Sequence, residues 1–253
     1  MNKILAANWK MNKGTKDVGD FLDNCPKELA SQGVRTIVAA SPILLPFLKS
    51  QVSSRQLKID VFAQNLHWQR SGAYTGECSV DQALEIGLKG SIIAHSERRK
   101  YFGESDESAS NRCQLALSCG LHVIYCIGES LAERKSGQTE EVLKKQLDVL
   151  IETLSKELST VVMTHQLIIA YEPIWAIGSG ESASNQQIEE SHLFLKNYLS
   201  EAKVPCPILY GGSVKPNNFA DIAKIPNVYG ALVGGASLEA KSFFELHRLI
   251  KET

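Results

Sequence analysis

Eight short apolar runs, separated by segments with helical character, constrain the fold of this chain more than any other feature. Each run is four to six residues long, and several are rich in β-branched residues. Apolar and polar residues do not alternate within them, which is typical of strands buried on both faces, as in a parallel sheet. The runs begin at Ile4, Thr36, Ile59, Ser91, His122, Leu167, Pro207 and Gly230.

The segments between the runs carry the chemistry of helix starts. Those that begin at Ser79, Ser105 and Thr139 open with a hydroxyl residue followed by acids and then by apolar residues at helical spacing. A hydroxyl can accept hydrogen bonds from first-turn N–H groups, and acids there complement the helix dipole. We therefore predict helices at these places.

Strand and helix thus alternate eight times, the pattern of a parallel α/β fold. An open doubly wound sheet would show the same alternation, so the pattern alone does not prove closure. Eight units in 253 residues nevertheless fit a closed (β/α)8 barrel better. No linker or low-complexity segment divides the chain, and we expect one domain over residues 1–253.

Composition excludes several classes of partner. With 27 basic and 28 acidic residues, no overall field favours nucleic acid or an anionic membrane. The six cysteines include no C-x-x-C pair, which argues against a disulfide or zinc framework, so we expect no metal. No apolar run approaches the roughly 20 residues of a membrane helix, and the four apolar residues before Asn8 are too few for the core of a signal peptide. We expect a soluble, cytoplasmic protein.

Residues that follow the predicted strands should gather on one face of a barrel, where enzymes of this architecture keep their sites. This set is polar, glycine-rich and chemically complementary. It comprises Asn8, Lys10, Ser41, Gln64, Asn65, His95, Glu97, Gly128, Glu129, Glu172, Gly211, Gly212, Ser213, Gly234 and Gly235.

Glycine pairs follow the last two predicted strands. Gly211–Gly212, with Ser213 next to them, and Gly234–Gly235 each precede a predicted helix, so backbone N–H groups could approach a phosphate without a side chain in the way. Ordinary strand-to-helix turns would explain either pair alone, but both together favour an anion site. No P-loop or G-x-G-x-x-G motif is placed to bind a nucleotide.

His95 differs from the other five histidines because it closes a strand and precedes Ser-Glu, a possible helix start. The helix dipole disfavours an imidazolium there, so His95 could stay neutral and donate a hydrogen bond. Lys10 could be a surface charge, a Schiff-base nucleophile or an electrostatic anchor. Glu97 could cap its helix, pair with Lys10, or do both.

Five motifs occur in a fixed order: NWKMN at Asn8, AHSERR at Ala94, AYEPIWAIGSG at Ala170, YGGSV at Tyr210 and LVGGASL at Leu232. Together with GAYTGE at Gly72 and CIGE at Cys126, they closely resemble the triosephosphate isomerase family. The resemblance extends from Asn8 to Leu238, nearly the whole chain, and the ordered set is far more specific than any one motif.

The resemblance implies an isomerase that interconverts dihydroxyacetone phosphate and D-glyceraldehyde 3-phosphate without a metal or an organic cofactor. It implies that Glu172 is the base and His95 a neutral electrophile, with Lys10, Asn8 and Glu97 beside them. By the same resemblance, the backbone N–H groups of Gly178, Ser213, Gly234 and Gly235 hold the phosphate. A lid is implied that consists of Pro173, Ile174, Trp175, Ala176, Ile177, Gly178 and Ser179.

The resemblance also implies a homodimer, in which the loop with Tyr74 and Thr75 inserts into the neighbouring subunit. The chain departs from the common family pattern at Ser179 and Glu181 in the lid, at Ala94 before His95, and at Tyr74. Two alternatives to the isomerase stay open: a Schiff-base aldolase on the same barrel, with Lys10 as its nucleophile, and a phosphate-binding protein without catalysis.

Overall fold

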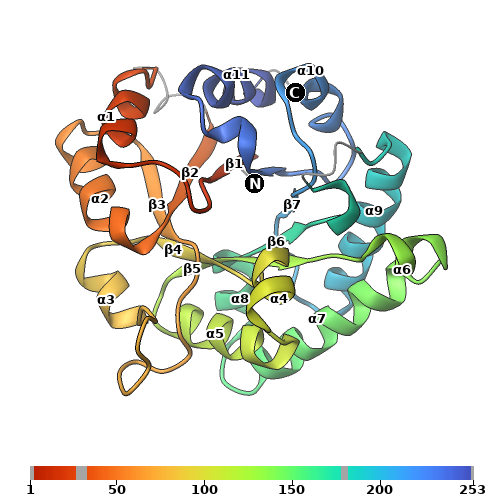
Figure 1. The fold of residues 1–253 in the computed structure, drawn as a ribbon. Helices are drawn as coiled ribbons and strands as arrows, with labels where there is room; N and C mark the ends of the chain where they lie inside the picture. The colour runs from red at the N-terminus through yellow and green to blue at the C-terminus, as the bar shows by residue number, and fades with distance from the viewer. Residues whose placement is uncertain (1–2, 27–32, 178–181, 252–253) are drawn as a thin grey trace.

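Eight parallel strands close into one barrel in the computed structural model, which describes residues 3–26, 33–177 and 182–251 (Figure 1). Each strand pairs with its neighbours in chain order, and β8 returns to β1. The predicted (β/α)8 barrel is therefore confirmed. The strands are β1 (Lys3–Asn8), β2 (Val34–Ala40), β3 (Ile59–Ala63), β4 (Gly90–Ile93), β5 (His122–Ile127), β6 (Leu167–Tyr171), β7 (Ile208–Tyr210) and β8 (Gly230–Val233).

Helices surround the barrel as a ring (Figure 1). They are α1 (Thr15–Asp23), α2 (Leu45–Ser54), α3 (Val80–Glu85), α4 (Ser96–Phe102), α5 (Asp106–Ser118), α6 (Leu131–Lys135), α7 (Thr139–Ser155), α8 (Thr160–Gln166), α9 (Asn185–Glu201), α10 (Pro216–Ile222) and α11 (Ala240–Lys251). Within the described residues, three short 3-10 helices follow strands: η2 (Pro42–Leu44), η3 (Ile174–Ala176) and η4 (Gly235–Ser237). Within the described ranges, no helix combines the length and apolar character needed to cross a membrane.

Two apolar layers explain why the strands lack polar alternation. Ile4 and Ala6 of β1 point into the barrel, where they join residues such as Phe62 and Ile124. Leu5 and the other outward-facing strand residues pack instead against the helices. Both faces of each strand are therefore buried, and burial of this apolar area supplies the main driving force for closure.

The seam between β8 and β1 requires a glycine. Gly230 pairs with Ile4 at a φ of 147°, and a Cβ at this position would lie 1.7 Å from the Ile4 carbonyl oxygen. Any side chain would both strain the backbone and force the two strands apart. Gly230 thus permits the last pairing that closes the barrel.

Two of the three predicted helix caps are confirmed, and one is wrong. The hydroxyls of Ser79 and Ser105 each accept a hydrogen bond from the third N–H of the following helix. Thr139, in contrast, is already the first residue of α7, and the cap position is taken by Gln138, whose side chain makes no capping bond. Gly137, with a φ of 75°, turns the chain immediately before it, so the helix starts one residue earlier than a Thr139 cap would allow.

Candidate active site

Glu172 follows β6 and is almost fully buried at the carboxyl end of the barrel. Its Oε1 lies 3.0 Å from Nε2 of His95, and its Oε2 accepts a hydrogen bond of 2.9 Å from the backbone N–H of Ser96. Both carboxylate oxygens therefore have a partner supplied by the start of α4. The structure brings together the predicted base and the predicted electrophile, although 77 positions separate them in the chain.

Two glycines on the neighbouring strands leave room for Glu172. A Cβ at Gly128, after β5, would lie 1.7 Å from the Glu172 carbonyl oxygen, and one at Gly211, after β7, would lie 2.9 Å from the Glu172 Cγ. The backbone on each side thus approaches Glu172 more closely than any side chain allows. This packing restricts the position of the carboxylate before any ligand binds.

His95 is the N-cap residue of α4, and its ring makes the capping bond. Nδ1 accepts from the Glu97 N–H at 3.2 Å, so Nδ1 carries no proton and Nε2 is the nitrogen that donates toward Glu172. A neutral imidazole with its proton on Nε2 satisfies both bonds. That tautomer can also donate to a carbonyl oxygen in the cavity.

Ala94 places His95 through an unusual backbone conformation. Strand β4 ends at Ile93, and Ala94 has a φ of 65°, in the left-handed region that favours glycine. Its N–H donates to Oε1 of the buried Glu104 at 2.9 Å, and its carbonyl accepts from Arg99 Nε at 3.0 Å. These two bonds hold the strained residue in place.

The pKa values of Glu172 and His95 depend on each other. Burial alone raises the pKa of Glu172, but His95 and the Ser96 N–H outweigh it, and the pKa is lowered from its usual value. Burial alone lowers the pKa of His95, but the Glu172 carboxylate outweighs it, and the pKa is raised. In this arrangement the partners of Glu172 favour its ionised form.

Lys10 lies after β1 in a left-handed conformation, with a φ of 52°. Its N–H donates to Asn8 Oδ1 at 3.0 Å, and its carbonyl accepts from Gln64 Nε2 at 3.0 Å. The ammonium lies 2.6 Å from Glu97 Oε1. Glu97 therefore pairs with Lys10, while the cap of α4 is His95 and not Glu97.

The two predicted anion loops lie at the ends of β7 and β8. Among the hydrogen bonds of the described residues, the N–H groups of Ser213, Gly234 and Gly235 donate to no other residue. Free amides at neighbouring strand ends form the kind of concave donor set that binds phosphate. A Cβ at Gly234 would come within 3.3 Å of Lys10 Cε, so the lysine lies directly beside this loop.

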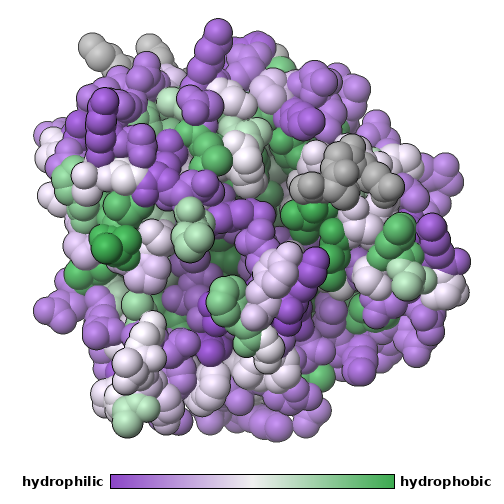
Figure 2. Space-filling view, in the orientation of Figure 1, coloured by the Kyte–Doolittle hydropathy of each residue, from purple (hydrophilic) through white to green (hydrophobic). Residues whose placement is uncertain are grey.

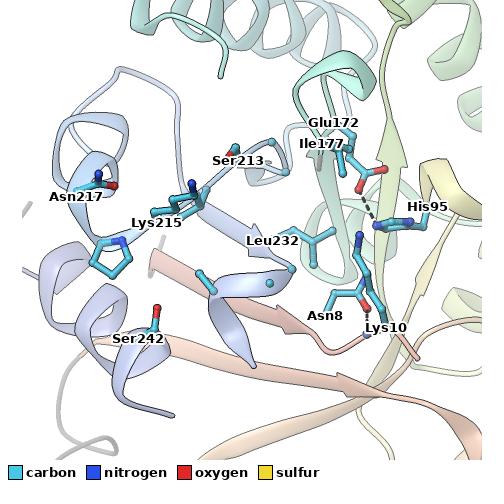
Figure 3. Close-up of a pocket in the computed structure, with 17 residues that line it drawn as sticks. Asn8, Lys10, His95, Glu172, Ile177, Ser213, Lys215, Asn217, Leu232 and Ser242 are labelled. Atoms are coloured by element: carbon cyan, nitrogen blue, oxygen red, sulfur yellow. Dashed lines mark hydrogen bonds and ion pairs between the residues drawn. The ribbon is translucent and has the colours of Figure 1, made fainter. Parts of the chain in front are cut away.

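One cavity of about 650 Å³ contains both groups of residues (Figure 3). Asn8, Lys10, His95 and Glu172 line one part, and Ser213, Gly234 and Gly235 line the adjoining part. Figure 3 shows Glu172 and His95 facing each other across one end of the cavity, with Lys10 next to His95. The cavity is large enough for a small phosphorylated ligand.

The predicted lid is described only in part. Ile174, Trp175 and Ala176 form η3 after Pro173, and the Trp175 Nε1 donates to the buried Glu129 at 3.0 Å. Ile177 lines the cavity. Gly178 and Ser179, with Glu181, lie outside the described residues, so the lid and the phosphate contact of Gly178 stay predictions.

The predicted dimer loop does not line this cavity. The Tyr74 ring lies against His67, with centroids 4.1 Å apart, and Thr75 next to it is exposed. The insertion of this loop into a neighbouring subunit stays a prediction.

The contacts that five residues make in the site could not be predicted from the sequence. Ser96 acts through its N–H, which every residue except proline has, so its identity carries no signal. Glu104 and Gln64 act on backbone groups of Ala94 and Lys10 from distant elements. Gly128 was predicted only as a strand-end residue, and Gly211 as part of an anion loop. Their contact with Glu172, which requires glycine at both positions, was not predicted. Across residues 3–26, 33–177 and 182–251, His, Cys, Asp and Glu form no group of three that could hold a metal ion.

Comparisons with known proteins agree with this geometry. The family model described as triosephosphate isomerase matches residues 3–250. A triosephosphate isomerase of Acetivibrio thermocellus is 38% identical over 98% of both chains. One from Bdellovibrio bacteriovorus is 41% identical over 97% of this chain and 99% of its own, and one from a Nostoc species is 42% identical over 95% of both.

Proposed function

The chain belongs to the triosephosphate isomerase family and is an isomerase that interconverts triose phosphates, and on that premise we propose that Glu172 is its base and His95 its electrophile. The reaction converts dihydroxyacetone phosphate to D-glyceraldehyde 3-phosphate and back, a step of glycolysis and gluconeogenesis. The observation that carries the proposal is the single cavity in which the buried Glu172–His95 pair adjoins a set of free amides.

Glu172 removes a proton from the carbon next to the substrate carbonyl, which leaves an enediolate. His95 donates its Nε2 proton to the carbonyl oxygen and recovers a proton from the neighbouring hydroxyl, whose oxygen becomes the new carbonyl oxygen. Glu172 returns the first proton to the neighbouring carbon. Protons and electrons balance without a cofactor. A free glutamate, with a pKa of about 4.3, is a poor base for a carbon acid, so the site has to stabilise the enediolate and exclude water from the carboxylate.

Lys10 and Asn8 support the charge that develops. The Lys10 ammonium lies between the anion loop at Gly234 and the Glu97 carboxylate, where it favours an anionic substrate and an anionic intermediate alike. Glu97 orients that ammonium. The same ion pair argues against the aldolase alternative, because an ammonium has no lone pair with which to attack a carbonyl.

The phosphate binds at Ser213, Gly234 and Gly235, whose amides supply dipoles and no titratable group. Holding the phosphate in a fixed orientation also protects the enediolate, because loss of phosphate from it would give methylglyoxal. The family resemblance adds Gly178 and a closing lid to this grip.

A coupled assay tests the proposal directly. The folded wild-type protein should convert each triose phosphate to the other, and absence of turnover would contradict the function. Treatment with borohydride in the presence of substrate separates the aldolase alternative, because only a Schiff base would leave a covalent adduct on Lys10. We expect full turnover and no adduct.

We also propose that the enzyme is a homodimer. Large apolar side chains lie exposed beside the site. Met11, 94% accessible, and Phe102, 69% accessible, line a second pocket together with Lys10 and His95, and Ile43, 88% accessible, follows Pro42 of the same pocket. Figure 2 shows green apolar side chains among polar ones on the face of the molecule that is turned toward the viewer. A second copy, with the loop of Tyr74 and Thr75 inserted beside this site, would cover them. Sedimentation should give the mass of two chains, and a single-chain mass at every concentration would contradict the dimer.

We place the enzyme in the cytoplasm, where glycolysis operates. The six cysteines are all unpaired, which supports a reducing compartment.

A further inference from the structure

The active-site cavity continues past the anion loops into a part that the isomerase reaction does not use. The beginnings of α10 and α11 line this part, which we call the annex, defined by Lys215, Pro216, Asn217 and Ser242. Figure 3 shows Lys215 and Asn217 on the opposite side of the cavity from Glu172 and His95, with Ser213 between the two sides.

The polar groups of the annex are available to a ligand. Lys215 caps α10 through its backbone N–H, which donates to Asn218 at 2.8 Å, so capping does not occupy the ammonium. In the described parts of the chain, no carboxylate lies within ion-pair distance of that ammonium, and the side chains of Asn217 and Ser242 donate to no other residue. Glu172, beyond the anion loops, is the only carboxylate among the described residues that line the cavity. The annex is therefore a cationic, hydrogen-bonding surface without a competing anion.

The annex lies close to the place proposed for the substrate phosphate. Lys215 follows Ser213 by two positions, so their Cα atoms are at most about 7 Å apart. A ligand whose phosphate occupies the amides of Ser213, Gly234 and Gly235 could therefore reach Lys215 with a second charged group across a short chain.

We propose that the annex is a second anion subsite, and that small acyclic compounds with two anionic groups, a phosphate and a second phosphate or carboxylate, bind across both subsites as competitive inhibitors. The proposal rests on the proposed function in one respect, the placement of the first phosphate. A triose phosphate, with one anionic group, leaves the annex empty and turns over without it.

Straight-chain alkanediol bisphosphates of increasing length, each compared with the alkyl monophosphate of equal length, provide the test. We expect at least one bisphosphate to inhibit isomerisation competitively, with an inhibition constant about fivefold lower than that of its monophosphate, the advantage of one exposed ion pair. Phosphorylated carboxylic acids of the same length show whether the second group has to be a phosphate.

K215M should abolish the advantage of the bisphosphate and leave turnover of triose phosphates and inhibition by monophosphates unchanged. K224M is the matched control, because it removes one equal charge beyond the far end of α10, about 13 Å from Lys215 along the helix, and should preserve the advantage.

Three results would overturn the subsite. Bisphosphates and monophosphates of every length could bind equally well, K215M and K224M could reduce the advantage equally, or K215M could weaken monophosphates as much as bisphosphates. The last two would mean that Lys215 only attracts anions through a general field. Turnover of triose phosphates is measured in the same preparations, so failure of the annex is distinguished from failure of the proposed function.

Discussion

The two halves of the active-site cavity differ in the groups that line them: side chains in one half and backbone amides in the other. On the side of β4 and β6, Glu172 and His95 are buried, titratable and paired with each other. On the side of β7 and β8, Ser213, Gly234 and Gly235 offer backbone amides and no charged group. Proton transfer needs groups whose pKa can change, whereas retention of a phosphate needs only donors in fixed positions. The first half should therefore be sensitive to deletion of side chains, and the second to their addition.

The largest effect should come from removal of the base. In E172Q the amide keeps the size of Glu172, but its single oxygen can accept from only one of His95 and Ser96, and it cannot accept a proton from carbon. We expect kcat to fall by about 10³–10⁴-fold with little change in KM, as measured in the coupled assay. Thermal unfolding serves as the control for folding. Retention of kcat within tenfold would remove Glu172 from the role of base.

His192 can be compared with His95, because it is a buried histidine without a carboxylate partner. His192 on α9 contacts the Asn227 carbonyl through Nδ1, and burial lowers its pKa to about 4. The folded protein therefore resists protonation of His192, while the unfolded chain takes up the proton near pH 6.5. The neutral form of His192 therefore contributes to stability above pH 6.5. As the pH falls from 6.5 toward 4, the free energy of unfolding decreases by about 3 kcal/mol.

The variant H192Q should therefore lose less stability than the wild type between pH 7 and pH 4, as measured by chemical denaturation at both pH values. The pKa of His122 is also lowered to about 4, and this histidine is present in both proteins. H192Q should therefore still lose some stability at acid pH, but less than the wild type. An equal loss in wild type and H192Q would show that His192 does not contribute.

Addition of one methyl group tests the amide half. In G234A the new Cβ would approach Lys10 Cε to about 3.3 Å, a contact tight enough to displace the ammonium or the loop. We expect KM for the triose phosphates to rise about tenfold, because one misplaced charge-assisted hydrogen bond costs about 1.5 kcal/mol. S213A is the matched deletion, since it removes a hydroxyl but keeps the amide, and KM should change less than about threefold. A larger effect of S213A than of G234A would invert the comparison.

The smallest effect should come from Ala94, whose left-handed backbone supports His95. A94G relieves about 1 kcal/mol of strain but gives the unfolded chain more freedom, so we expect a net gain in stability below about 1 kcal/mol. Denaturation midpoints measure this gain, and kcat should stay unchanged because Glu104 and Arg99 still hold the backbone. A loss of stability would show that the methyl group packs favourably.

The sequence predicts the two halves of the site unequally. Glu172, His95 and Lys10 could be predicted as site residues because their side chains suit the proposed chemistry and follow recognisable strands, and the structure places all three in one cavity. The glycine pairs predicted an anion site, since the absence of side chains is itself visible in a sequence. The Ser96 N–H could not be predicted as a ligand of Glu172, because an amide leaves no trace in residue identity.

The strand pattern predicted the barrel well for a related reason. Burial of both strand faces leaves a long-range composition signal, which Ile4, Leu5 and Ala6 illustrate within three positions. A helix cap depends instead on the geometry of one turn, and the conformation of Gly137 moved the start of α7 away from the predicted Thr139 cap. In the sequence, only the number of strand–helix units favoured closure of the barrel. The role of Gly230 in closure is visible only in the structure, where its backbone lies against that of Ile4.

The seam between β1 and β8 joins the first and last strands of the chain, and the site forms only when these two strands pair. Lys10 follows β1, and Gly234 follows β8, so the ammonium and the amides meet only after residues more than 220 positions apart have paired. A ribosome that has made nine-tenths of this chain has made no active site. Recovery of isomerase activity during refolding should consequently report the slowest long-range step, closure of the ring, and not the earlier formation of helices.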